Sequence, residues 1–438
     1  MIRLSFLLVS ALALTSCASQ IELPGSVLPP EVARVAVADM GPPVDWRSVD
    51  AATGEIENLN ELIALADDFP DSASVRRSLM RARFATSDDA GMLQDALWLT
   101  RRTLEPGAST QRQLLEMYSG SDRAALEKAF AQLPTPLASS VNDTGFPLEI
   151  RLPESAMWDA QEGRMLVTSI VSRGLYALDL DGDWREVPIA NAGSLAGIAL
   201  DAPRGLIWVA SGVVHQTPDP DTAFRGVIAL DRITLAERRR VAAPRGATIS
   251  DIAIGPDGTV YGSDPLGGGV YSATISQSAM QAFIAPGTFR SPQGIAVRRD
   301  NSSLYISDYR YGLAQVMLRS RHVYRMRAAE PMLLDGVDGL WLHGNHLIAV
   351  QNGLRPHRIT SFELGEGIGV IASHRVLERA NPAWIEPLGG AITGDTLYYI
   401  GNGQWDFYDQ GGAVAVGAQP SDGQVHALQL VETPAEQP

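Results

Sequence analysis

A repeated unit of three short strands dominates the sequence after about residue 146. The unit is an apolar strand, a tight polar turn, a second strand that ends in small or polar residues, then a glycine and a third strand. Its second strands end at positions 169, 211, 264, 308, 352 and 402, so the spacings are 42, 53, 44, 44 and 50 residues. These spacings are close to the length of a four-stranded propeller blade.

A single unit of this kind buries its faces poorly, whereas a closed ring of units buries them all and leaves only short edges. The sequence therefore predicts a mainly β chain with a six-bladed β-propeller over residues 146–431. A β-sandwich is the structural alternative, but six similar units argue against it. We expect Leu148–Leu152, which precedes the first copy, to supply the outer strand of the last blade and so to close the ring.

Residues 57–135 have helical rather than strand periodicity. Leu59, Leu62, Ile63 and Ala66 fall on one helical face. Asp71 or Ser72 is predicted to cap a second helix, and Ser87 a third. Gly120-Ser121 separates two further short helices. We expect a small module of helical hairpins that either packs against the propeller or presents a surface to a partner.

The N-terminus predicts an export signal. Arg3 precedes an apolar run from Leu4 to Leu14, which is too short to span a bilayer. The run ends Leu14-Thr15-Ser16-Cys17, which resembles the bacterial lipobox. The resemblance implies a signal peptide over 1–16, acylation of Cys17 and a lipid-anchored envelope protein. Ala18 favours the periplasmic side of the outer membrane over the inner membrane.

Cys17 is the only cysteine of the chain, so no disulfide can form within it. An ordinary signal peptide with an incidental cysteine is the alternative. Residues 17–56 are proline-rich and predict an extended tether. The formal net charge is −15, and no basic stripe is present, which disfavours nucleic acid as a partner.

The repeats over roughly 146–431 resemble the SMP-30/gluconolactonase family and its NHL-repeat relatives. The most specific match is Glu154-Ser155-Ala156-Met157-Trp158, which is similar to the opening of the family's first blade. The resemblance implies one divalent cation on the propeller axis, most often calcium, and hydrolysis of lactones or related esters. Oxygen ligands suit such a cation.

The family's ligands carry over residue by residue. Glu154 matches the glutamate, and Asp338 matches the aspartate that in the family also serves as general base. The two asparagine positions fall on Ser250 and Gln293. Serine is a poor substitute ligand, and Asp251 is predicted to compensate by turning inward. The expected cation ligands are thus Glu154, Asp251, Gln293 and Asp338, with Ser250 beside them.

A second set of polar residues ends the second strands. These are Asp264, Asp308, Asn352 and Asn402, with Ser169 and Ser211. They either line a binding site at the channel mouth or cap backbone groups in turns. Trp405 lies in a long insertion after Asn402 that either covers a ligand or pins its own loop.

Three functions follow. The leading hypothesis is a metal-assisted hydrolase of the lactonase type that acts on a small periplasmic molecule. The main alternative is a non-catalytic propeller that holds a ligand or an envelope protein partner. An isomerase or lyase on the same scaffold is the third.

Overall fold

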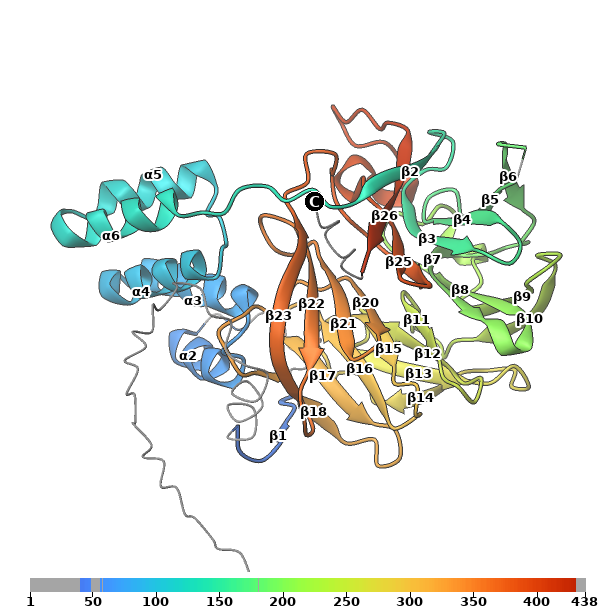
Figure 1. Cartoon of the computed structure of the whole chain (residues 1–438), viewed down its shortest axis with the longest axis horizontal. Coiled ribbons are helices and arrows are strands. Elements are labelled where there is room, and N and C mark those ends of the chain that lie inside the picture. Colours follow the sequence, from blue (N-terminus) through green and yellow to red (C-terminus); the bar gives the residue numbers. More distant parts are fainter. Residues whose placement is uncertain (1–39, 49–55, 57, 180, 431–438) are drawn as a thin grey trace, which may run out of the picture.

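The computed structural model describes residues 40–48, 56, 58–179 and 181–430. The chain is mainly β, with helices gathered beside the sheets (Figure 1). The α-helices are α2 (Leu59–Asp68), α3 (Ala73–Ala85), α4 (Asp89–Arg101), α5 (Ala108–Met117) and α6 (Gly120–Ala131). Within the described residues, no helix is long and apolar enough to cross a membrane.

The first three sheets each contain four antiparallel strands in chain order. Sheet 1 contains β3 (Pro153–Asp159), β4 (Arg164–Ser169), β5 (Leu175–Leu178) and β6 (Trp184–Val187). Sheet 2 contains β7 (Ser194–Asp201), β8 (Leu206–Gly212), β9 (Gly226–Asp231) and β10 (Glu237–Ala242). Sheet 3 contains β11 (Ile252–Ile254), β12 (Val260–Asp264), β13 (Gly269–Ala273) and β14 (Gln281–Ile284).

The remaining three sheets recruit strands from elsewhere in the chain. Sheet 4 contains β15 (Pro292–Val297), β16 (Ser303–Asp308), β17 (Gly312–Met317), β18 (Val323–Arg325) and β1 (Val44–Asp45). Sheet 5 contains β20 (Gly339–His343), β21 (His346–Gln351), β22 (Arg358–Leu364), β23 (Val370–Arg379) and β19 (Arg327–Ala328). Sheet 6 contains β24 (Gly390–Thr393), β25 (Thr396–Ile400), β26 (Gly423–Gln429) and β2 (Val141–Phe146).

The first strands of neighbouring sheets contact one another in a closed cycle. β3 contacts β7, β7 contacts β11, β11 contacts β15, β15 contacts β20, β20 contacts β24, and β24 returns to β3. Apolar side chains of adjacent sheets pack together between them, as Trp208 of sheet 2 does with Tyr271 of sheet 3. This arrangement is consistent with a β-propeller.

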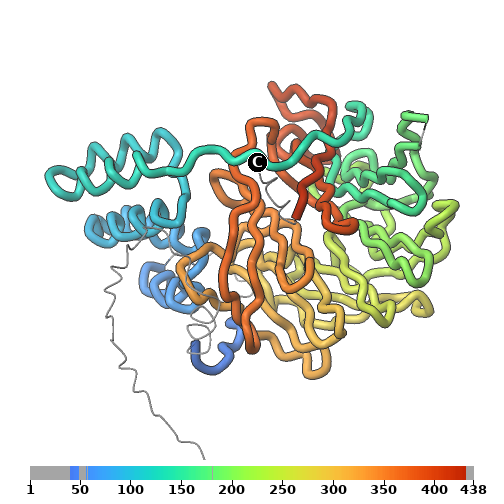
Figure 2. Tube along the Cα trace, viewed as in Figure 1, coloured from blue at the N-terminus to red at the C-terminus, as the bar shows by residue number. Residues whose placement is uncertain are grey.

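The strand that completes sheet 6 differs from the one predicted. β2 pairs with β26, from Val141 opposite Ala427 to Phe146 opposite Gly423 (Figure 2). The prediction of Leu148–Leu152 as this strand was wrong, because that segment is a loop in which Leu152 has a φ of +49°. Its apolar residues resemble a strand because Ile150 and Leu152 are buried in the core. Gly423 is required opposite Phe146, since a Cβ there would lie 1.7 Å from the Phe146 ring.

Polar side chains cap the first turns of α2, α3 and α4. Asn58 caps α2 by accepting hydrogen bonds from the amides of Asn60 and Glu61, and Ser72 caps α3 through the amide of Val75. The α4 helix is capped by Asp88, and the prediction of Ser87 was wrong. Ser87 has a φ of +58°, so it belongs to the turn before the helix.

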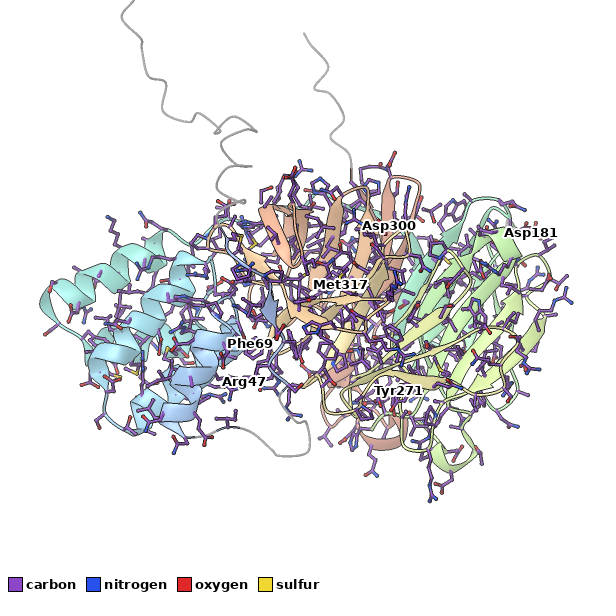
Figure 3. The ribbon with its side chains drawn as sticks, turned by 90° about the horizontal axis from the view of Figure 1, so that it is seen from below. Arg47, Phe69, Asp181, Tyr271, Asp300 and Met317 are labelled. Carbon is purple, nitrogen blue, oxygen red and sulfur yellow. The ribbon has the colours of Figure 1, made fainter. Side chains whose placement is uncertain are left out.

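The helices are attached to the sheets by a buried carboxylate at the start of α3. Asp335 accepts hydrogen bonds from the amides of Ala73 at 2.9 Å and Ser74 at 2.7 Å. These amides would otherwise lack partners at a helix N-terminus, where the helix dipole also favours a negative charge. Figure 3 shows the helices to one side of the sheets, with Phe69 directed toward them. Phe69 stacks on Tyr311 with ring centroids 4.8 Å apart.

Part of the segment predicted to be a tether is bound to sheet 4. β1 pairs with β18, with Val44 opposite Arg325. Trp46 is buried beside Phe69 and Phe289, and its indole donates a hydrogen bond to the carbonyl of Thr288 at 3.0 Å. The tether prediction was therefore wrong for these residues. The rest of the predicted signal peptide and tether, including Cys17, lies outside the described residues.

Candidate functional site

Residues in or just before the first strands of five sheets and Gly389, next to the first strand of the sixth, line one small cavity. It offers about 10 Å³ to the centre of a water molecule, roughly the space that one water needs. We call it the acidic cavity. Its lining includes every predicted cation ligand and Ser250: Glu154, Ser155, Gly197, Ser250, Asp251, Gln293, Asp338, Gly339 and Gly389.

Glycines let the strands approach closely enough to form this cavity. A Cβ on Gly197 would lie 2.7 Å from Asp251 Oδ1 and 2.9 Å from the Ser250 carbonyl oxygen. A Cβ on Gly389 would lie 2.3 Å from Ser155 Oγ. The amide of Gly197 donates a hydrogen bond to the Ser250 carbonyl at 2.8 Å, which joins sheets 2 and 3 at the cavity.

Each carboxylate of the cavity has a fixed hydrogen-bond donor. The Trp405 indole donates to Glu154 Oε2 at 3.1 Å. The amide Nδ2 of Asn352 donates to Asp338 Oδ2 at 2.8 Å. Asp251 accepts from the backbone amides of Ile252 at 2.9 Å and Ile295 at 3.2 Å. The acids are thus oriented by neutral donors and not by a direct ion pair.

Tyr309 extends this set of contacts. Its hydroxyl donates to Asn352 Oδ1 at 3.0 Å, so Asn352 links the tyrosine to Asp338. Because the amide oxygen of Asn352 is occupied in this way, its nitrogen is directed at the carboxylate. Asn352 is therefore a positioning residue for Asp338.

Burial and mutual repulsion raise the pKa values of the clustered acids. Burial raises the pKa of Asp338 to about 6, while the Asn352 hydrogen bond opposes the shift. Burial, and less strongly the charge of Asp338, raises the pKa of Asp251 to about 7. The pKa of Glu154 lies well above its usual range because of burial and then the charges of Asp338 and Glu386. Such shifts mark a place where a proton or a cation stabilises the fold.

The donor set suits a hard divalent cation in part. It offers carboxylate oxygens from Glu154, Asp251 and Asp338 and the amide oxygen of Gln293. In the described part of the chain, however, no three His, Cys, Asp or Glu side chains are arranged to hold one metal ion. A cation here would therefore take at most two of these acids together with neutral oxygens and water, a coordination that is common for Mg²⁺.

The other predicted site residues separate into two groups. Asp264 accepts from the amides of Leu266 and Gly267, and Asp308 accepts from the amides of Arg290, Ser291, Arg310 and Tyr311. Asn402 bonds to the backbone of Asp422 and Gln424. These three side chains stabilise turns. Asn352 and Trp405 instead contact the acids of the cavity.

Glu386 is a site residue that the sequence reasoning missed. Burial raises its pKa to about 7, and Asp338 adds to the shift. Its carbonyl accepts a hydrogen bond from the amide of Gly403 at 2.8 Å, which attaches the insertion around Trp405 to this edge of the cavity. An acid shortly before the glycine that opens the sixth repeat was the available signal.

No protein-family profile and no curated protein matches the sequence. Solved structures of similar architecture include regucalcin, a calcium-binding protein from Agrobacterium tumefaciens, at 18% identity and a TM-score of 0.45; the match covers 67% of this chain and 94% of that one. A gluconolactonase from Xanthomonas campestris matches at 15% identity and a TM-score of 0.41, over 67% of this chain and 99% of that one.

The PQQ-bound aldose sugar dehydrogenase from Streptomyces coelicolor matches at 14% identity and a TM-score of 0.43, over 67% of this chain and 97% of that one. The structural neighbours of the chain thus include SMP-30/gluconolactonase-like proteins.

Proposed function

We propose that the six sheets are the blades of a six-bladed β-propeller, that the helices of residues 57–135 form a module fixed to its side, and that the acidic cavity lies on its axis. The closed cycle of contacts between first strands supports the blade count. The bonds between Asp335 and the first turn of α3 support a fixed module. The Leu14-Thr15-Ser16-Cys17 motif supports a lipid-anchored envelope protein, more consistent with the outer than the inner membrane.

The function proposed for this propeller is cation-assisted hydrolysis of a small lactone or ester at the acidic cavity. One observation carries the proposal: acids from three different sheets line one cavity together with Gln293. Glu154, Gln293 and Asp338 stand at positions that the family resemblance implies for its ligands, and Asp251 lies beside Ser250, which stands at the fourth. A bound Ca²⁺ or Mg²⁺ would polarise a carbonyl and lower the pKa of a coordinated water.

The chain itself supplies a base and its orientation. Asp338, with a pKa of about 6, is largely ionised at pH 7. Its pKa is also close enough to 7 for the carboxylate to accept a proton from water. Asn352 keeps one oxygen of this carboxylate occupied, so the other is the one available for proton transfer. Burial raises the pKa values of Glu154 and Glu386 beside it, and the charge of Asp338 adds to both shifts.

The proposal is tested by calorimetric titration of Ca²⁺ and Mg²⁺ into the purified protein, followed by a panel of lactones and esters. Glu154→Gln and Asp338→Asn preserve side-chain shape and should abolish cation binding, and Asp338→Asn should also abolish any hydrolysis. Asp300→Asn is the matched control, because Asp300 is an exposed acid of an outer turn (Figure 3). Hydrolysis that is unchanged by both cavity substitutions would refute the proposal.

A non-catalytic propeller is the second candidate. The observation that favours it is the neutral pair Ser250 and Gln293, together with the lack of three described acids that could share one ion. Under this alternative the cavity or the helices hold a ligand or an envelope protein. Cation binding without turnover of any lactone or ester would favour this non-catalytic alternative.

A further inference from the structure

A larger cavity lies among the helices, beside the propeller loop that carries Arg355. Its volume is about 570 Å³, within the range of roughly 300–1,000 Å³ that is usual for small-molecule sites. It is lined by α3, α4, the loop between α4 and α5, α5 itself and one residue of the loop after β21, Arg355. We call it the helical pocket. Most of its lining is apolar, including Met80, Phe84, Met92, Leu99, Leu114 and Met117.

Contacts between the helices and the propeller hold the walls of the helical pocket in place. The amide of Glu105 donates a hydrogen bond to the carbonyl of Arg355 at 2.9 Å, which joins the loop between α4 and α5 to sheet 5. Arg77 donates to the carbonyl of Gly353 at 3.4 Å from the opposite wall. Leu99 and Leu104 pack in one cluster with Leu333 and Leu354 of the propeller side. Both walls are therefore held in place by contacts that do not involve a ligand.

The charged residues of this pocket are mostly cationic, in a chain whose net charge is −15. Arg77, Arg81 and Arg355 line it, and Glu105 is its only acid. Burial lowers the pKa of Arg77, because its positive charge has lost water. A bound anion would stabilise that charge. Guanidinium groups bind carboxylates with paired hydrogen bonds.

Apolar walls and cationic groups in one cavity define the chemistry of its occupant. The aliphatic part of a ligand would displace water from the methionine- and leucine-lined surface, at about 0.8 kcal/mol per methylene buried. Methionine side chains adapt to chains of different shape. Two of the apolar residues, Phe84 and Met117, are 51% and 40% exposed without a ligand, so their burial would contribute to binding.

We propose that the helical pocket binds a single-chain aliphatic carboxylate, with its hydrocarbon chain among the methionines and leucines and its carboxylate at Arg81 and Arg355. The site is separate from the acidic cavity and does not depend on the function proposed for that cavity. An apolar peptide helix is the competing kind of occupant, but a cavity of this volume suits a chain of about a dozen carbons better than a peptide.

The test is calorimetric titration of the full chain with dodecanoate below its micellar concentration, with butyrate, dodecyl maltoside and dodecyltrimethylammonium as comparison ligands. Dodecanoate should bind, and the other three should bind at least about tenfold more weakly, since each lacks either the chain or the negative charge. Equal affinity for the uncharged or cationic amphiphile would overturn the role of the arginines.

Variants locate the binding to this pocket. Arg81→Gln and Arg355→Gln should each weaken dodecanoate binding by about tenfold, whereas Arg112→Gln, an exposed arginine of α5 outside the lining, should not. Gly107→Phe should block the pocket, because a Cβ there has no neighbour within 4 Å and the residue lines the cavity. Ser109→Phe, exposed on the same helix, is its control.

Thermal melting without ligand establishes that each variant is folded. Dodecanoate binding that is unaffected by Gly107→Phe and by both arginine variants would overturn the proposal. Binding of an amphipathic helical peptide, but not of dodecanoate, would overturn it in favour of a protein partner.

Discussion

At the scale of single residues, the acidic cavity holds negative charge where water is scarce. The pKa of Asp338 is about 6, that of Asp251 about 7 and that of Glu386 about 7. In the unfolded chain these groups titrate near pH 4. Between about pH 4 and 7 the folded protein therefore binds more protons than the unfolded chain does.

The contribution of these three acids to the free energy of unfolding should consequently fall as the pH rises through this window and level off above about pH 7, because their protons are lost. At pH 8 without divalent cations, Asp338→Asn should raise the free energy of unfolding by about 1–2 kcal/mol, since a buried charge is removed while the Asn352 contact can persist. Denaturant unfolding at pH 5 and pH 8 measures both effects.

Asp300→Asn on an exposed turn is the control for this measurement. A gain from Asp338→Asn at pH 8 that is no larger than its gain at pH 5 would contradict the raised pKa of Asp338. Added Ca²⁺ should stabilise the wild type more at pH 8 than at pH 5, because protons compete with the cation for the same carboxylates.

A second group of buried polar residues holds the seam between sheets 5 and 6. The Tyr399 hydroxyl donates to Glu378 Oε2 at 2.9 Å and accepts from the Trp384 indole at 3.0 Å. The other oxygen of Glu378 accepts from the Ser140 hydroxyl at 2.8 Å, next to β2. The network therefore fixes the segment that completes sheet 6.

Tyr399→Phe should lower the free energy of unfolding by about 2 kcal/mol, because it leaves buried Glu378 and Trp384 without one partner each. Tyr398→Phe is the matched control, since Tyr398 belongs to the apolar cluster on the other face of the same strand. Equal effects of the two substitutions, measured by denaturant unfolding, would show that the network contributes nothing specific.

At the scale of elements, the most informative contact is that between α3 and the propeller. Ser72 caps the Val75 amide and Asp335 takes the amides of Ala73 and Ser74, so the first turn of α3 is satisfied only when the helix is docked. Ser72 also donates to the carbonyl of Arg310 at 2.6 Å. A capping prediction from local sequence identifies Ser72, but cannot identify Asp335, which lies more than 250 positions away.

Asp335→Ala should destabilise the protein by about 2–4 kcal/mol, with faster amide exchange concentrated in α2 to α4, because two helix-terminal amides lose a charged acceptor. Asp335→Asn, which keeps one acceptor oxygen, should have a smaller effect. Asp89→Ala, at an exposed acid in the first turn of α4, is the control. Uniform protection in all four proteins would contradict a docking role.

At the scale of the whole molecule, the proposed lipid anchor at Cys17 makes a prediction that does not depend on the fold of the sheets. Under the proposal that Cys17 carries a lipid, Cys17→Ser should move the protein from the membrane to the soluble fraction of the cell envelope, because the variant lacks the residue that would be acylated. Fractionation after labelling with a fatty-acid analogue measures this. Retention of label and membrane association in the variant would contradict the lipoprotein proposal.

The spacing of the repeats predicted the strands of the ring well, because every unit has the same alternation and similar turns. The family resemblance implied that Glu154, Gln293 and Asp338 lie together, with Asp251 turned inward, and all four line one cavity. Hydrophobicity alone could not distinguish a paired strand from a buried loop, so Leu148–Leu152 was mistaken for β2.

The repeat, the mainly β architecture and the helical segments could be predicted from the order of the amino acids, because periodicity and capping are local properties. That Asn352 and Trp405 bond to the cavity acids, while Asp264, Asp308 and Asn402 stabilise turns, became clear only from the folded arrangement. The helical pocket also appeared only in the structure, because it depends on how three helices pack together and against Arg355, more than 200 positions further along the chain. Such contacts form only when distant segments meet in the folded chain, so the pattern of neighbouring residues does not predict them.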